Sequence, residues 1–214
     1  MLKKQQFVNQ IAGSIEQELA VAAPELRKSG LIFTFPLNEG MAGWIGLNIA
    51  SSRSDGLIGV NPVVGVRSEQ VEILVKQLGG ETRGGPSATV STALGYLMPE
   101  KRFLEWLFEQ SPGFDYVSEA KKIALAIESY GIPFMRTTAS LGAVIENLEH
   151  LRFSFKESAM YRLPVAYLLG DKLDLAASYV NDQMQAMAGR QDASAFRYRE
   201  FAKAVIERAA LLAS

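Results

Sequence analysis

The chain of 214 residues contains no cysteine and a single histidine, His150. Without thiols it has no disulfide and no thiolate nucleophile, and one imidazole excludes zinc fingers and every metal site that needs two histidines. A serine-histidine-aspartate triad would depend wholly on His150, and neither Gly-x-Ser-x-Gly nor His-Glu-x-x-His occurs. The sequence therefore predicts no metal, no cofactor and no catalytic residue, and a non-enzymatic role is favoured while an enzyme stays open.

The sequence also has no excess of charge of one sign and no long apolar run. The 22 basic and 23 acidic residues give a net charge of -1, which offers nothing to attract a phosphate backbone. No window approaches the roughly 18 uninterrupted apolar residues of a membrane-spanning helix, and no apolar run of a secretory signal follows the first residues. We therefore expect a cytoplasmic protein that binds neither nucleic acid nor a membrane.

With 48% hydrophobic and 21% charged residues, the composition is typical of a chain that folds around an apolar core. Its length exceeds the roughly 100 to 150 residues typical of one domain. We predict one α+β domain over 1–214, with a sheet-containing part at 1–98 and a helical part at 99–214. A boundary near 111–113 or 152–156 is the alternative.

The first part alternates between helical and strand periodicity. Apolar residues at spacings of three and four predict a helix over 4–22, and alternation with a period of two predicts strands at 31–37, from Trp44 to 52, and at 57–66. Asp55-Gly56 between the last two runs is a hairpin signal, so the three strands form an antiparallel meander.

A helix over 68–78 follows, with Ser68 as its N-cap and two glycines at its end. Threonine and valine then predict a fourth strand over 87–97. Beyond Pro99 every segment has helical spacing. The expected helices are one carrying Phe103, Trp106, Leu107 and Phe108, one at 116–130 ended by Gly131-Ile-Pro133, one at 141–150 capped by Ser140, and a run of three at 163–171, at 173–188 preceded by Asp171 as cap, and at 192–213.

Strand alternation assigns the sheet two unequal faces. The core face is Phe33, Phe35, Leu37, Ile45, Leu47, Ile49, Ile58, Val60, Val64, Val66, Val90 and Leu94. The opposite face, called the second face below, carries three interior glycines together with Trp44, Asn48, Asn61 and Arg67. Since glycine inside a strand often marks a close approach, either a C-terminal helix packs on this face or a partner or ligand binds there, unless the register is misread.

Pro62 lies inside the third predicted strand. Proline donates no hydrogen bond to a sheet, so this strand should be at an edge or bulged at Pro62. An exposed edge is a place where an extended peptide can add a further strand.

The order helix, three strands, helix, strand, with Phe33-Thr-Phe35 in the first strand and an apolar helix at Val71 to Leu78, resembles small bacterial secretion-chaperone-like and toxin-immunity-like α+β proteins. The resemblance covers about the first 98 residues. It implies a protein that binds another protein without catalysis.

The sequence therefore predicts a soluble, non-enzymatic protein-binding protein of a chaperone-like, immunity-like or adaptor-like kind. Its contacts would be Trp44, Asn48, Asn61 and Arg67, on the second face or at the strand edge near Pro62. The alternative is a small-molecule-binding protein or enzyme with a groove between the sheet and the C-terminal helices, using Arg67 to bind an anion. A homodimer that pairs the same sheet edge is the third hypothesis.

Overall fold

The computed structural model describes residues 4–51, 57–80, 87–150 and 156–214. They form two compact units: unit 1 is Met1–Val66 with Ser91–Thr138, and unit 2 is Arg67–Val90 with Ala139–Ser214. The chain passes between the units at 66/67, 90/91 and 138/139. The candidate boundary at 111–113 falls inside unit 1, and 152–155 lies outside the described residues.

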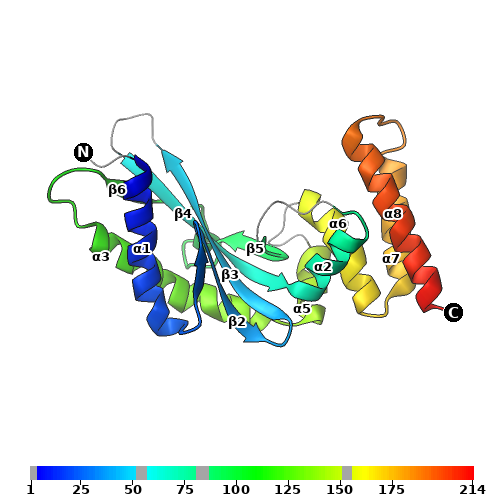
Figure 1. Cartoon of the computed structure of the whole chain (residues 1–214), viewed down its shortest axis with the longest axis horizontal. Coiled ribbons are helices and arrows are strands. Elements are labelled where there is room, and N and C mark those ends of the chain that lie inside the picture. Colours follow the sequence, from blue (N-terminus) through cyan, green and yellow to red (C-terminus); the bar gives the residue numbers. More distant parts are fainter. Residues whose placement is uncertain (1–3, 52–56, 81–86, 151–155) are drawn as a thin grey trace. The chain divides into compact units, whose positions relative to one another are not determined.

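Unit 1 contains the sheet and the helices on its core face (Figure 1). Its elements are α1 (Lys4–Ala22), β1 (Arg27–Ser29), β2 (Ile32–Asn38), β3 (Met41–Ser51), most of β4 (Leu57–Ser68) and of β5 (Val90–Ala93), η1 (Leu94–Tyr96), β6 (Trp106–Glu109), α3 (Tyr116–Ala126), η2 (Ile127–Gly131) and α4 (Ile132–Thr138).

The sheet has six strands in the order β1-β2-β3-β4-β5, and β6 also pairs with β4. The pairs β1/β2, β2/β3 and β4/β6 are antiparallel. The predicted α+β class is confirmed, and α1 has the predicted bounds. The predicted hairpin turn at Asp55-Gly56 lies outside the described residues.

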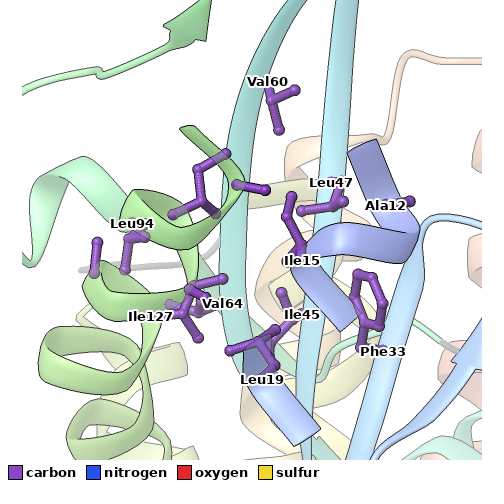
Figure 2. Packing of buried hydrophobic residues seen from close by; sticks show 14 of the residues in the cluster. Ala12, Ile15, Leu19, Phe33, Ile45, Leu47, Val60, Val64, Leu94 and Ile127 are labelled. Carbon is purple, nitrogen blue, oxygen red and sulfur yellow. The ribbon is translucent and has the colours of Figure 1, made fainter. Parts of the chain in front are cut away.

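The core of unit 1 lies between the sheet and its helices. Figure 2 shows Ile15 and Leu19 of α1 directed toward Ile45 and Leu47 of β3. Every residue predicted for the core face is buried except Leu37 and Ile49, which are half-buried. Each fully buried aliphatic or aromatic side chain contributes about 1.5–3 kcal/mol, so the residues of this face that belong to unit 1 contribute substantially to its stability.

The predicted helix carrying Phe103, Trp106, Leu107 and Phe108 is wrong. Residues 106–109 form strand β6, which pairs antiparallel with β4: Trp106 faces Val60 and Glu109 faces Leu57. Phe108 is fully buried whereas its neighbour Leu107 is 54% exposed, which is the two-residue alternation of a strand. Over so short a run the apolar spacing is compatible with a helix and with a strand. Pairing with β4 selects the strand.

Two other boundaries differ from the sequence prediction. The strand predicted over 87–97 is shorter, because it ends at Ala93 and a 3₁₀ turn follows at Leu94–Tyr96. Pro133 does not end the preceding helix. Ile132 N–H donates to the Ile127 carbonyl in the π-helical segment η2, and this wider turn shifts the hydrogen-bond register just before the proline, so α4 continues.

Unit 2 is helical apart from the strand ends that enter it. Its helices are α2 (Glu69–Gln77), α5 (Leu141–Glu149), α6 (Lys156–Leu169), α7 (Leu173–Ala186) and α8 (Ala193–Leu212), and α7 and α8 lie side by side (Figure 1).

Two predicted helix caps in unit 2, at Ser68 and Ser140, are confirmed by hydrogen bonds. Ser68 Oγ accepts from Val71 N at 3.4 Å and Ser140 Oγ from Ala143 N at 3.2 Å. Asp192 caps α8 as well, which was not predicted: its Oδ1 accepts from Ala195 N at 3.1 Å. The hydrogen bond from the Arg190 guanidinium, reinforced by the backbone donors of the cap, lowers the pKa of Asp192 to about 2.

Asp171 does not cap α7, contrary to the prediction. It has φ of +57°, in the left-handed region, and Lys172 is the N-cap residue. The N–H groups of Asp171 and Lys172 donate to the carbonyls of Leu168 and Tyr167, which is the hydrogen-bond pattern of a Schellman motif. Asp171 therefore ends α6 in the conformation that glycine usually supplies.

Pro164 lies inside α6, where it removes one backbone donor and frees the carbonyl four residues earlier, that of Met160. The hydroxyl of fully buried Tyr198 in α8 donates to this Met160 carbonyl at 3.3 Å. Burial raises the pKa of Tyr198, so the phenol keeps its proton. Tyr198 thus satisfies a carbonyl that the proline leaves without its helical partner.

We predict that Tyr198→Phe destabilises the protein by about 1–3 kcal/mol, because the Met160 carbonyl is left buried without a donor. In a Pro164→Ala background the restored backbone N–H satisfies that carbonyl, and the same substitution should cost clearly less. Chemical denaturation of the four chains measures both costs. Equal costs in the two backgrounds would contradict the link between proline and phenol.

Candidate functional site

Trp44 lies on the second face of the sheet, where β3 places it opposite Thr34 of β2. It is half-buried, and its indole extends along β3 over Gly46, so that a Cβ at Gly46 would collide with the ring. Gly46 therefore makes room for the protein's own tryptophan.

We predict that Gly46→Ala displaces the Trp44 indole into water and shifts its fluorescence emission to longer wavelength. The colliding atoms are the far end of a rotatable side chain, so the cost in stability should be only about 1 kcal/mol. Gly13→Ala is the matched control, since a Cβ at Gly13 in α1 meets nothing within 4 Å. An unshifted emission in Gly46→Ala would contradict the packing of the indole over Gly46.

The other two glycines of the second face are also covered. The side chain of Glu105 lies over Gly59, where an added Cβ would collide with its carboxyl group. Gly65 is buried. The small residues of the face thus accommodate side chains of the chain itself at Gly46 and Gly59.

The two predicted asparagine contacts differ in their surroundings. Asn48 of β3 is exposed. Asn61 of β4 is 5% exposed, and its Nδ2 donates to the Leu104 carbonyl at 2.6 Å. Gly95 lets the segment around Leu104 pack closely, since a Cβ at Gly95 would lie only 3.0 Å from Leu104 Cβ. Asn61 therefore anchors the chain that leads into β6.

Arg67, the fourth predicted contact, belongs to unit 2. Its Nε donates to Glu69 Oε1 at 2.8 Å and its Nη1 to the Ser87 carbonyl at 2.9 Å. A further carboxylate, that of Glu72, lies 3.9 Å from Nη1. With two carboxylates beside it, this guanidinium gives no support to the predicted anion clamp.

The prediction that Pro62 marks a sheet edge is wrong. Strand β4 has β3 on one side and both β5 and β6 on the other. The register with β6 covers Leu57 to Val60, so Pro62 follows the last of these paired residues, and it is buried. The missing donor of the proline therefore falls beyond the β6 pairing and not at an exposed edge.

Two exposed apolar side chains, those of Phe103 and Leu107, lie beside and on strand β6. Phe103 is 58% exposed and Leu107 is 54% exposed. Leu107 pairs with Gly59, which places its side chain on the second face, and Glu105 and Glu109, two residues away on either side, are also exposed. We call Phe103, Glu105, Leu107 and Glu109 the β6 surface.

The β6 surface was not predicted from the sequence, because the apolar spacing of these residues was interpreted as that of a helix. The available signal was the short run Glu105-Trp-Leu-Phe-Glu109, in which an acidic residue stands at each end of three apolar ones.

Unit 2 holds a buried ion pair. Arg162 of α6 donates through Nε to Glu72 Oε1 at 2.7 Å and through Nη2 to Glu72 Oε2 at 2.9 Å, with side chains 7% and 2% exposed. Thr89 Oγ1 donates to Glu72 Oε1 at 2.8 Å and accepts from Ser68 N at 2.9 Å. Ser87 Oγ accepts from Arg162 Nη2 at 3.1 Å. This bidentate geometry joins α2, α6 and the strand ends.

The arrangement resembles that of an activated nucleophile, because the Thr89 hydroxyl donates to the Glu72 carboxylate and Arg162 holds that carboxylate in place. Two observations speak against a catalytic role for these three side chains. Both oxygens of Glu72 already accept hydrogen bonds from the Arg162 guanidinium, and Oε1 accepts a further one from Thr89. Thr89 is 1% exposed, which leaves a substrate no access to its oxygen. The arrangement is that of a structural ion pair.

Among the described residues, no group of three or more histidine, cysteine, aspartate or glutamate side chains is placed to hold a metal ion. His150, the single imidazole, is the exposed C-cap residue of α5. Within the same described ranges, no helix is long and apolar enough to cross a membrane.

Comparison with protein-family models, with curated proteins and with solved structures finds no match for this chain.

Proposed function

We propose that this chain is a non-enzymatic protein-binding protein, chaperone-like, immunity-like or adaptor-like, and that it binds its partner at the β6 surface. The observation that carries the proposal is the exposure of Phe103 and Leu107 on and beside a short strand of the sheet. Exposed apolar side chains rimmed by charged ones are typical of interaction sites.

The neighbouring contacts support this location. Trp44 and Asn48 lie on the same second face as Leu107, and Trp44 offers part of an indole, a side chain favoured at interface centres. Asn61 holds the segment that leads into β6 through the Leu104 carbonyl, so the β6 surface is presented by a fixed backbone.

Site-specific photocrosslinking tests the proposal. A photoreactive amino acid replaces Leu107 in one chain and Leu125 of α3 in the control, since Leu125 is 50% exposed in the same unit. We expect a covalent adduct with a second polypeptide, in an extract of the source cells, at position 107 and not at 125.

Equal adducts at both positions, or none at 107, would contradict the proposal. A crosslink at 107 in the purified protein alone would identify the partner as a second copy and support the homodimer hypothesis.

A further inference from the structure

Strand β6 lies at an edge of the sheet. Within the described residues it pairs with β4 alone. In an antiparallel pair alternate residues direct their N–H and C=O groups away from the partner strand, so the outer side of β6 presents backbone donors and acceptors. Such a row of groups is a template for one more strand.

The opposite edge of the sheet is protected in a way that β6 is not. Strand β1 is Arg27-Lys28-Ser29, with all three residues exposed, and Lys28 Nζ pairs with Glu16 at 2.8 Å. Positive charges on an edge strand discourage pairing with another chain. Strand β6, with the sequence Trp-Leu-Phe-Glu, contains no lysine, arginine or proline.

Charge on the β6 surface selects the partner. Leu107 and Glu109 alternate along β6 and so share its second-face side, and Glu105, just before the strand, lies over Gly59 on the same face. Opposite charges on directly facing residues of two strands stabilise the pair, and like charges destabilise it. A strand beside β6 is favoured when its apolar residue faces Leu107 and its basic residues face the two glutamates.

The same rule disfavours a second copy of β6 in this place. In an antiparallel pair of two β6 strands centred on Leu107, each Glu105 faces the Glu109 of the other copy. The charge pattern therefore points to a different chain.

We propose that the outer edge of β6 binds an extended segment of a partner protein as an added antiparallel strand. That segment has an apolar residue flanked, two residues away on each side, by lysine or arginine. This inference rests on the proposed function and names the chemistry of the partner.

Two synthetic peptides are the probes. The first has valine flanked, two residues away on each side, by lysine, with threonine elsewhere, and the second has glutamate in place of lysine. Titration of the isotope-labelled full-length chain, followed through the amide signals of β6, gives both affinities. We expect the lysine peptide to bind about tenfold more tightly, because two cross-strand charge pairs change from attraction to repulsion. The preference should fall as salt is added.

The double variant Glu105→Lys/Glu109→Lys should reverse the preference. Its matched control is Glu100→Lys/Glu128→Lys, which changes the net charge equally at two exposed positions of unit 1 outside β6 and should leave the preference unchanged. A lysine peptide N-methylated on the amides that face β6 should lose its binding, because strand addition needs these donors.

The inference is overturned by a failure of the lysine peptide to bind, by an unchanged preference in the Glu105→Lys/Glu109→Lys chain, or by undiminished binding of the methylated peptide. If crosslinking at 107 still yields a partner in these cases, the partner chemistry fails while the proposed function stands. If that crosslink is absent as well, both fail.

Discussion

Arg162→Met is expected to destabilise the protein by about 3–5 kcal/mol, because it leaves the carboxylate of Glu72 buried without its counter-charge. The side chain of Glu72 is 2% exposed, and Arg162 supplies two of the hydrogen bonds to its oxygens. Chemical denaturation followed by circular dichroism measures the loss.

Two controls make the result specific to a buried pair. The double variant Glu72→Leu/Arg162→Met removes both charges and should recover much of the lost stability, because no uncompensated charge remains. Lys203→Met breaks the exposed pair of Lys203 with Glu200, 2.8 Å apart, and should cost less than about 1 kcal/mol. If Arg162→Met costs no more than Lys203→Met, the buried ion pair does not have the role assigned to it.

Phe108→Ala is expected to destabilise the protein by about 3–5 kcal/mol, because a fully buried ring is lost from the core of unit 1. That ring packs edge-on against Phe114, with centroids 6.2 Å apart. Leu107→Ala, one residue earlier, should cost less than about 1 kcal/mol, since Leu107 is 54% exposed.

Chemical denaturation of the two variants measures the contrast. It tests the strand directly, because adjacent residues of a strand point to opposite faces. Similar costs at 107 and 108 would contradict the alternation on which both β6 and the proposed binding surface depend.

The candidate site was only partly predictable from the sequence. Alternation placed Trp44 and Asn48 on the second face, and both lie on exposed or half-buried positions there. The bonds of Asn61 to the Leu104 carbonyl and of Arg67 to the Ser87 carbonyl were not predictable, because these partners are distant in the chain, 43 residues from Asn61 and 20 residues from Arg67.

The sequence by itself determined the elements whose signals are local. The core face of the sheet, the bounds of α1 and the caps at Ser68 and Ser140 follow from residues within a few positions of one another. The absence of cysteine and of a second histidine likewise excluded whole classes of chemistry.

Only the tertiary structure decided that residues 106–109 are a strand, that Pro62 lies within the sheet, and that Glu72 meets Arg162 across 90 residues. A short apolar run is compatible with a helix or a strand, and the pairing partner that selects one of them is distant in sequence. Hydrogen bonds and ion pairs between distant segments form only when the chain has folded, so no local pattern encodes them.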